Sequence, residues 1–489
     1  MILKEFAGTT MPEEDFLQKK LQEARLQLAS RQLAIKEAKL PVIVLMEGWG
    51  AAGKGSLLGK VIHNMDPRFY QVYNMDVATE EELRRPFLYR FFKRIPMQGQ
   101  FAFYDGGWMD AATRPYLHGD IDKKEYRALM NSNQRFERQL MDNGYLVVKF
   151  FFHIDKKEQR KRLENLGSDK STAWRVTQND VWQNKYYKEC MKVYDDYLDE
   201  TNSKEMPWHI IDSTHKKWAE LQMLVTLVAS IDMALEVQNS TPAIQRNPFV
   251  MKPLPPLREI NLDKKLSEKE YRDQLKKCQK HLKKLHNELY RRKIPVIIAY
   301  EGWDAAGKGG NIKRVASALD ARGCDVYPIA SPEPGEKARH YLWRFWTRLP
   351  KTGHIAIFDR TWYGRVMVER LEGFCSENDW QRAYHEINEF EKELTDWGAI
   401  VIKFWVQIDK DTQLERFTLR QNTPEKQWKI TDEDWRNREK WDLYEAAVDE
   451  MIAKTSTKFA PWHILESNDK KFARIKALET IIKEIEKRL

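Results

Sequence analysis

Cysteine is scarce in this chain, whose 489 residues include four, Cys190, Cys278, Cys324 and Cys375. They are scattered and form no Cys-x-x-Cys pair, so the sequence offers neither a thiolate metal site nor a disulfide framework. We therefore expect free thiols and a cytoplasmic protein. The sequence also lacks an apolar run long enough to span a bilayer. Its start soon becomes acidic and Gln-rich, unlike the apolar core of a signal peptide.

Charge is abundant in both signs, with 82 Lys and Arg against 73 Asp and Glu, which gives a formal net charge of +9. Spread over this length, the excess is moderate, so nucleic acid, an anionic membrane and a polyanionic substrate all stay open as partners. The 17 tryptophans and an aromatic content of 12% argue against a disordered chain. We expect folded domains with a basic surface.

Most of the chain is repeated once. Gly48 recurs as Gly302, 254 positions later, and Asp105 recurs as Asp359 at the same offset. A period this long indicates a duplicated domain, because solenoid repeats run about 20–50 residues. The expected organisation is a first domain at residues 1–240, a Pro-rich linker at 241–263 and a second domain at 264–489.

Each half alternates apolar strands with helices, which predicts an α/β fold with a parallel sheet covered by helices on both faces. Functional sites in such sheets lie at the carboxyl ends of the strands. The expected strands of the second half are 295–300, 325–329, 354–359, 399–408 and 462–465, and the expected helices are 267–293, 310–319 and 377–397.

The segment Glu301–Gly310 follows a buried strand and has the glycine and lysine spacing of a P-loop, in which backbone amides cradle phosphates. Lys308 would add positive charge. A P-loop usually continues with Ser or Thr, whose hydroxyl binds magnesium, but Gly309 stands there. The alternative reading is a tight turn before a helix. The loop residues expected to bind phosphate are Gly302, Ala305, Ala306, Gly307, Gly309 and Gly310.

Two acids fall where a metal ion would be useful. Asp304 lies inside the loop, and Asp359 ends the strand at 354–359. Magnesium prefers one or two carboxylates together with water and phosphate oxygens. We therefore expect Asp304 and Asp359 to hold Mg²⁺, with Asp304 also able to orient the attacking oxygen.

Phosphoryl transfer depends on positioning and on cancelling the charge of the moving group. The second half carries many cations beyond Lys308. Lys403 lies in an apolar strand, where its partner would be either a phosphate or a carboxylate. Arg416 and Arg420, four apart, fall in a basic helical segment at about 415–445 that would suit a lid closing over phosphates. A solvated helix face is the alternative for part of this segment. The candidate cations are Lys313, Arg344, Arg348, Arg360, Arg365, Lys403, Arg416, Arg420 and Lys429.

Three segments of the second half resemble the polyphosphate kinase 2 family: Glu301–Gly310, residues 354–365, and Trp428-Lys429 with Trp441 and Tyr444. The tandem arrangement resembles its two-domain branch, the polyphosphate:AMP phosphotransferases. The resemblance implies transfer of the terminal phosphate of inorganic polyphosphate to AMP, giving ADP, with magnesium. It also implies tandem P-loop kinase domains, each with a thymidylate-kinase-like core and a helical lid.

The resemblance also implies roles for individual residues. Lys308 and the loop amides would bind the transferring phosphates, and the two acids would hold magnesium and orient the acceptor. Arg360, with Arg416 and Arg420 of the lid, would neutralise charge. Arg344, Arg348 and neighbouring lysines would line the track of the polyphosphate chain. Two mild departures from the family pattern are Thr361, where Ser is usual, and Gly364, where Asn is usual.

The first half departs from this pattern severely. Gly50 stands where the second half has Asp304, and Gly106 stands where it has Arg360. Losing one preorganised transition-state contact costs about 2.7–4 kcal/mol, so several losses predict a nearly inactive domain. Two further cations, at Arg365 and Arg420 of the second half, are replaced by Ala111 and Leu166. The retained residues are Lys54, Arg90, Arg94, Asp105, Lys149 and Arg162.

Other functions stay open at this point. The acceptor could be ADP, giving ATP, and a nucleotide kinase with ATP as donor would keep the loop and lid. A non-catalytic P-loop protein could bind nucleic acid or another polyanion through basic and aromatic residues. The dense cations favour polyphosphate, and a binding module has no need of Asp304 and Asp359. We expect no membrane or nucleic-acid partner, and exposed aromatic helices that permit a homo-oligomer.

Overall fold

The computed structural model describes residues 2–6, 11–75, 77–236, 248–430 and 432–489. The first part of the expected linker at 241–263 therefore lies outside the described residues. The chain forms two compact units, neither of them one continuous segment. The first unit comprises residues 1–79, 90–240 and 334–340, and the second comprises residues 80–89, 241–333 and 341–489. The expected cut near residue 240 therefore misses two short segments that pack with the unit encoded by the other half of the sequence.

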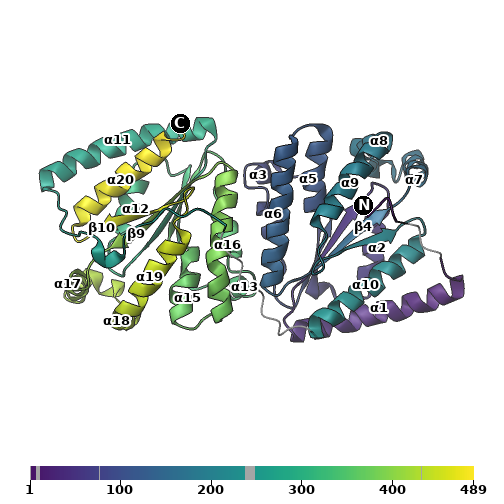
Figure 1. Ribbon diagram of the computed structural model, residues 1–489, viewed down its shortest axis with the longest axis horizontal. Coiled ribbons are helices and arrows are strands. Elements are labelled where there is room, and N and C mark those ends of the chain that lie inside the picture. Colours follow the sequence, from purple (N-terminus) through teal and green to yellow (C-terminus); the bar gives the residue numbers. More distant parts are fainter. Residues whose placement is uncertain (1, 7–10, 76, 237–247, 431) are drawn as a thin grey trace. The chain divides into compact units, whose positions relative to one another are not determined.

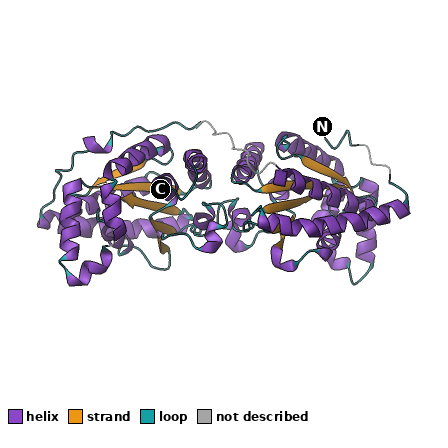
Figure 2. Ribbon diagram, turned by 90° about the horizontal axis from the view of Figure 1, so that it is seen from below, coloured by secondary structure: helices purple, strands orange, loops and turns teal. Residues whose placement is uncertain are grey.

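Each unit is built around a parallel sheet of five strands enclosed by helices (Figures 1 and 2). The strand order is β2-β3-β1-β4-β5 in the first unit, and β7-β8-β6-β9-β10 repeats that order in the second. The first sheet consists of β1 Val42–Gly48, β2 Tyr70–Asn74, β3 Phe101–Asp105, β4 Leu146–His153 and β5 Trp208–Asp212. The second consists of β6 Val296–Gly302, β7 Cys324–Pro328, β8 Ile355–Asp359, β9 Ile400–Gln407 and β10 Trp462–Glu466.

The central strands are apolar because both of their faces are covered. Every residue of β9 is buried, and β6 is buried up to its last residue, Gly302. The edge strand β7 is half exposed. All five strands expected in the second half are present, as are the α/β class and the duplication. Apolar runs of this length and composition predict buried parallel strands.

Helices cover both faces of each sheet (Figure 1). In the second unit α11, α12 and α20 contact one another, and α16 with α19 forms the other layer. The helices of the first half are α1 Glu14–Glu37, α2 Lys54–Val61, α3 Glu80–Leu83, α4 Tyr89–Phe92, α5 Trp108–His118, α6 Lys123–Asp142, α7 Lys156–Ser168, α8 Gln178–Lys185, α9 Tyr187–Thr201 and α10 Lys216–Glu236. Those of the second are α11 Glu268–Arg292, α12 Lys308–Ala316, α13 Pro334–Lys337, α14 Trp343–Trp346, α15 Val368–Leu371, α16 Glu377–Asp396, α17 Lys410–Gln421, α18 Asp432–Glu439, α19 Trp441–Thr455 and α20 Lys470–Glu486.

Helix α10 differs from expectation, because its length and apolar composition alone would allow it to cross a membrane. In the structure it packs against α1, α2, β4 and β5. Ala219, Leu224, Leu227 and Ile231 are buried there. The buried helix of a globular core passes the same test of length and composition, so its packing explains its apolarity.

The basic helical segment expected as a lid at about 415–445 is made of several short elements. It consists of the end of α17, the 3₁₀ segment Pro424–Lys429, α18 and the start of α19. Thr423 and Pro424 end the α17 pattern, since proline restricts the residue before it to extended backbone. These short elements follow β9 and lie beyond its carboxyl end.

Strand register brings the glycine-rich loop and the acid of β8 to one edge of the second sheet. Tyr300 of β6 is paired with Asp359 of β8 in parallel register. The loop begins two residues after Tyr300, at Gly302. Both features therefore emerge side by side at the carboxyl ends of neighbouring strands, where sites of such sheets lie.

Candidate active site

The glycine-rich loop adopts a backbone conformation that its sequence makes accessible. Gly302 has φ +152°, and a Cβ at this position would lie 2.6 Å from the carbonyl oxygen of Val406 on β9. Gly307 has φ +112° and is the N-cap residue of α12. Ala305 also has positive φ, at +60°. The loop thus turns tightly from β6 into the N-terminus of a helix, where unpaired amides and the helix dipole favour an anion.

Lys308 begins α12 and lies across the loop. Its Nζ donates to the carbonyl oxygens of Gly302 at 2.5 Å and Trp303 at 3.2 Å. Lys54 of the first unit makes the same two bonds to its own loop, at 3.1 and 3.0 Å. An ammonium group has three donors, so this arrangement leaves room for a bond to a phosphate oxygen.

Asp304 is held from two sides. Its Oδ1 lies 3.8 Å from a guanidinium nitrogen of Arg360, and its Oδ2 accepts a hydrogen bond from the Asn437 amide at 3.1 Å. Its backbone carbonyl accepts from Gln413 of α17 at 3.1 Å. Three parts of the second unit therefore meet at Asp304: the loop, the end of β8, and the lid segment with α17 and α18.

Arg360 is surrounded by acidic groups. Burial lowers the pKa of its guanidinium, but the carboxylates of Asp304, Glu301, Glu433 and Asp359 raise the pKa further, so the net shift is upward. Arg360 is therefore a fixed positive charge, and its side chain is still 57% exposed. It can meet an incoming anion without leaving its acidic partners.

The backbone of Arg360 is strained. Its φ is +67°, in the left-handed region that L-residues other than glycine rarely adopt. The equivalent residue of the first unit is Gly106, at φ +73°. The same turn thus exists in both units, and the second one carries a charged side chain where glycine would be less strained.

Glu301 connects the loop to β8, a role that sequence analysis missed. Its buried carboxylate accepts hydrogen bonds from the amide of Thr361 at 2.7 Å and from the Thr361 hydroxyl at 2.8 Å. Burial raises the pKa of Glu301, against the opposing effects of Lys308 and Thr361. The signal was present, because glutamate also precedes the glycine of the first loop, as Glu47.

Trp303 stacks on Trp441, the first residue of α19, with ring centroids 3.7 Å apart and planes at 8°. Trp49 of the first unit stacks on Tyr187 in the same way, at 3.9 Å and 9°. The contact joins the loop to the end of the lid segment in both units. The sequence signal for this contact was a tryptophan that directly follows the first glycine of both loops.

Arg416 does not serve as the expected phosphate ligand of the lid. Its guanidinium donates to the carbonyl oxygens of two loop residues, at 3.0 Å each, and to those of Ser467 and Asn468 after β10, at 2.5 and 3.2 Å. Burial, and then the charge of Arg420, lowers its pKa to about 10. Arg162 makes the equivalent four bonds in the first unit. We therefore correct its role to holding the loop against the segment after β10.

Lys403 is likewise not a phosphate ligand. It is fully buried in β9, where its Nζ donates to Glu391 Oε2 at 2.7 Å, to the Tyr363 hydroxyl at 2.8 Å and to the Thr455 carbonyl at 2.7 Å. All three donors of the ammonium are used inside the protein. The carboxylate alternative was therefore correct, and the cost of burying the lysine is met by an ion pair.

The remaining predicted cations have mixed surroundings. Arg365 forms an ion pair with Glu369 at 3.1 Å and lies over the Tyr341 ring at 4.4 Å. Arg344 donates to the Ala330 carbonyl at 2.9 Å, and Arg348 donates to the carbonyl of Arg344 at 2.6 Å. Arg344 lies in α14, which is a single turn, and Arg348 lies beyond its end, so the two arginines do not share a helix. None of these contacts tests a polyphosphate track.

Five further predicted residues complete the set. Lys313 is exposed on α12, and Arg420 lies on α17 close enough to Arg416 to affect its pKa. Gly309 has open space around its Cβ position, and a Cβ on Gly310 would lie 3.2 Å from the guanidinium of Arg474. The side chains of Lys426, Trp428 and Lys429 lie outside the described part of the chain.

The donor set at this edge suits a hard cation that is completed by substrate. Within the described residues, no group of three or more His, Cys, Asp and Glu side chains is arranged to enclose a metal ion. Asp304 and Asp359 instead offer two carboxylates, and magnesium typically takes one or two together with phosphate oxygens and water. The residues therefore fit Mg²⁺ bound jointly with a phosphate chain.

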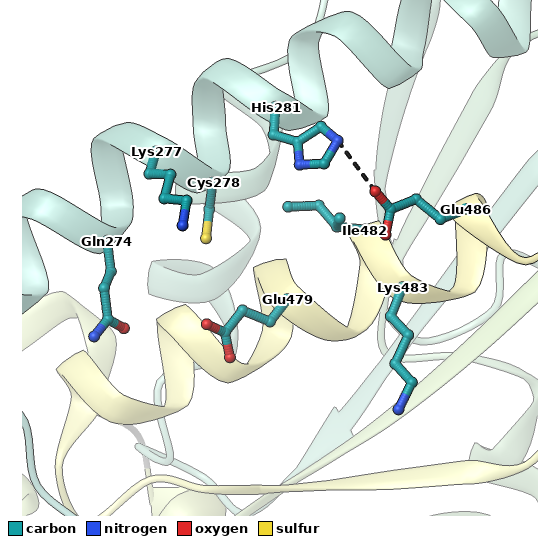
Figure 3. Close-up of a pocket in the computed structure, with 8 residues that line it drawn as sticks. All are labelled: Gln274, Lys277, Cys278, His281, Glu479, Ile482, Lys483 and Glu486. Atoms are coloured by element: carbon teal, nitrogen blue, oxygen red, sulfur yellow. Dashed lines mark ion pairs between the residues drawn. The ribbon is translucent and has the colours of Figure 1, made fainter.

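A cavity of about 390 Å³ lies elsewhere in the second unit, between α11 and α20 (Figure 3). His281 and Glu486 form an ion pair of 3.2 Å across it. None of its lining residues belongs to the loop, to β8 or to the lid segment. This cavity is separate from the candidate active site.

Fold and site together define a duplicated α/β protein with a glycine-rich loop at the carboxyl edge of each parallel sheet. A model of the family described as Polyphosphate kinase 2 matches residues 11–239 and 265–489. The chain belongs to the polyphosphate kinase 2 family. Kinases of this family generally need a divalent metal ion.

Known relatives extend over the whole chain. The polyphosphate:AMP phosphotransferase of Pseudomonas syringae pv. tomato is 39% identical over 479 residues, covering 97% of this chain and 96% of the relative. That of Acinetobacter johnsonii is 36% identical over 447 residues, covering 91% and 90%. A crystal structure from Pseudomonas aeruginosa PA01, described as a polyphosphate kinase 2, matches with a TM-score of 0.87 and 38% identity and covers 100% of this chain and 99% of that one.

Proposed function

We propose that this chain transfers the terminal phosphate of inorganic polyphosphate to AMP, giving ADP, and that the second unit does so. The observation that carries the assignment is the Asp304 carboxylate, held between Arg360 and Asn437 at the mouth of the glycine-rich loop. The first unit has glycine in place of both Asp304 and Arg360. Family membership and the full-length similarity to polyphosphate:AMP phosphotransferases support the substrates.

In this reaction the terminal P–O–P bond of polyphosphate breaks, and an oxygen of the AMP phosphate forms the new P–O bond. The shortened chain leaves as an oxyanion. The attacking oxygen is already ionised near neutral pH, since the second pKa of a phosphate monoester is about 6. The main task is therefore to cancel charge and to align two polyanions.

Residues of the second unit divide this task. Lys308 and the loop amides bind the transferring phosphate, and Arg360 balances charge that builds up on it. Arg416 and Glu301 keep the loop in place through the contacts described above. Asp304 and Asp359 would hold Mg²⁺, which would supply further charge neutralisation.

One pair of variants tests which unit is active. We expect Asp304→Asn to lower kcat by roughly 100-fold or more, in line with the loss of one preorganised charge contact. Asp105→Asn, the matched change in the first unit, should leave kcat within about two-fold of wild type. Equal losses in both variants would show that the first unit also catalyses.

The acceptor is decided by a product assay. Purified protein, magnesium and long-chain polyphosphate are mixed with either AMP or ADP, and the product nucleotide is identified. We expect ADP from AMP as the main reaction. Preferential formation of ATP from ADP would replace this proposal with the nucleoside diphosphate alternative, and transfer only from ATP would replace the donor.

The first unit would then serve as a packing partner, a polyphosphate-binding extension or a regulator.

We also propose a cytoplasmic location, which the four cysteines outside disulfides support. Cell fractionation with an antibody against the chain tests the location.

A further inference from the structure

The first unit differs from the second at one loop position in a way that its own structure explains. A Cβ built on Gly50 would lie 2.0 Å from Oδ1 of Asp180, 2.9 Å from its Cγ and 3.2 Å from its Cβ. Real Cβ atoms do not approach other atoms within 3.0 Å. The space that a side chain at position 50 would need is therefore filled by Asp180, which lies on α8.

The backbone of Gly50 is also occupied. Its amide donates to Gln183 Oε1 at 2.7 Å, and its carbonyl accepts from Gln159 Nε2 at 3.2 Å. Gln183 is only 4% exposed, and its own amide group donates to the Tyr194 hydroxyl at 2.7 Å. A backbone amide of the glycine-rich loop is thus bonded to a buried side chain of α8.

The orientation of Asp180 is fixed within α8. Asp180 and Thr177 form a capping box at the start of the helix, in which each side chain accepts from the backbone amide of the other. The Thr177 hydroxyl also donates to the Asp180 carboxylate at 2.7 Å. The two bonds to the Asp180 carboxylate use Oδ2, while Oδ1 faces the space beside Gly50.

The second unit uses the equivalent helix differently. Residues 432–439, α18, correspond to α8 at the offset of 254, and Asn437 corresponds to Gln183. Asn437 donates to the carboxylate of Asp304, whereas Gln183 accepts from the backbone amide of Gly50. The same pair of elements therefore orients a functional carboxylate in one unit and takes up a loop amide in the other.

We propose that α8 closes the glycine-rich loop of the first unit through an autoinhibitory contact of Asp180 and Gln183 with Gly50. The loop keeps its lysine and its shape but is not available to phosphate. This explains how the first unit can retain a phosphate-binding loop without acting as a second site. The inference concerns contacts inside the first unit and does not depend on which substrate the second unit uses.

Hydrogen exchange of the full-length protein, read by mass spectrometry, tests the closure. Gly50→Asp restores the side chain found in the second unit and must displace Asp180. We expect amides of α8 to exchange about ten-fold faster or more, since one lost hydrogen bond and a like-charge contact together are worth about that factor. Helix α9 should exchange as in wild type.

Gly59→Asp is the matched control. The substitution adds the same charge, and Gly59 lies on α2 with open space around its Cβ position. It should leave the exchange of α8 unchanged. If α8 exchanges at the same rate in wild type and Gly50→Asp, or if Gly59→Asp accelerates it equally, the proposed contact does not hold the helix.

A second pair of variants covers the case in which Gly50→Asp fails to fold. Asp180→Ala and Thr177→Ala both break the capping box, but only the first empties the space beside Gly50. We expect Asp180→Ala to accelerate exchange within residues 48–56 several-fold more than Thr177→Ala does. Equal effects would reduce the role of Asp180 to capping and overturn the proposal.

Inorganic tripolyphosphate provides a test of occlusion in wild-type protein. It should slow exchange in the second loop, residues 302–310, and leave residues 48–56 unaffected. Protection of residues 48–56 would overturn the closure. Absence of protection at residues 302–310 would count against the proposed function alone, and the Gly50→Asp comparison would still decide the closure.

Discussion

Arg360 keeps a backbone conformation that lowers stability, in the unit where its charge can serve function. An L-residue in the left-handed region costs about 1–2 kcal/mol, and the first unit avoids this cost with Gly106 at the same turn. The strained arginine is kept in the unit that also has Asp304. Strained backbone of this kind is concentrated at functional sites.

We predict that Arg360→Gly lowers kcat by roughly 100-fold or more, because a charge contact to the transferring phosphate is lost. The free energy of unfolding should change by no more than about 1 kcal/mol, since the relief of strain offsets the loss of the Asp304 ion pair and the greater freedom of glycine in the unfolded chain. Steady-state kinetics and urea unfolding measure the two effects.

Gly106→Arg is the matched change in the first unit. It should lower the free energy of unfolding by about 1–2 kcal/mol through backbone strain and leave kcat as in wild type. A large loss of kcat in Gly106→Arg, or an unchanged kcat in Arg360→Gly, would contradict the division of roles between the two units.

Glu47 gives a prediction for pH. Burial, followed by the charge of Asp110, raises its pKa from 4.5 to about 8. The folded state therefore binds this proton more tightly than the unfolded state, so the free energy of unfolding falls as pH rises from about 4.5 to about 8. Glu47→Gln, which cannot ionise, should be more stable than wild type at pH 9, by up to a few kcal/mol.

This difference should largely disappear at pH 5, where the Glu47 carboxyl is protonated in the folded state. Urea unfolding of wild type and Glu47→Gln at the two pH values provides the measurement. A variant that loses stability equally at both pH values would show that the carboxylate form is the one that the first unit requires.

At the scale of elements, β9 and α16 are joined by a buried ion pair. Lys403 and Glu391 are both completely buried, 2.7 Å apart. The first unit has the same pair between β4 and α6, in Lys149 and Glu137, at 2.8 Å. A feature that is kept equally in the unit that lacks counterparts of Asp304 and Arg360 is expected to serve structure.

We predict that Lys403→Met lowers the free energy of unfolding by about 3–5 kcal/mol, because it leaves a buried carboxylate without its partner. Adding Glu391→Leu should restore much of that loss, since a buried ion pair can often be replaced by apolar side chains. The KM for polyphosphate of the double variant should match that of wild type.

A phosphate-binding role of Lys403 would give the opposite result. If Lys403 bound phosphate, Lys403→Met would retain its stability and raise the KM for polyphosphate. Thermal unfolding and steady-state kinetics on the same preparations distinguish the two cases, and Lys149→Met reports the structural cost in the first unit.

The elements themselves were largely predictable. Apolar runs marked β6 and β9, and the helix expected at 267–293 is present as α11, whose start is held by a capping box of Ser267 and Glu270. The lid was harder, because its interruption near Pro424 depends on local backbone restrictions within a generally helical charge pattern. The expected helical segment at 415–445 is made of several short elements, of which α17 and α18 meet the loop.

For the whole molecule, the net charge of +9 matters most for a substrate that is itself a long polyanion. We predict that raising the salt concentration from about 0.05 to 0.5 M raises the KM for polyphosphate by on the order of ten-fold, through screening. The KM for AMP, which carries few charges, should change much less. Kinetics at constant free magnesium measure both, and equal salt dependence would argue against an extended polyphosphate track.

Self-association also stays a prediction, to be checked by light scattering.

Sequence alone determined the duplication and the parallel sheets, and it placed the glycine-rich loop and the two acids at the ends of strands, because each rests on local pattern or on a fixed offset along the chain. Tertiary structure decided which cations reach the site. Arg416 meets a loop carbonyl 111 positions away, and Asn437 meets Asp304 across 133. No local pattern specifies such partners, since a buried charge takes whichever polar group the packing brings to it. For the same reason, the sequence could not predict the contact of Asp180 with Gly50. There the folded chain fills the space that a side chain at position 50 would need.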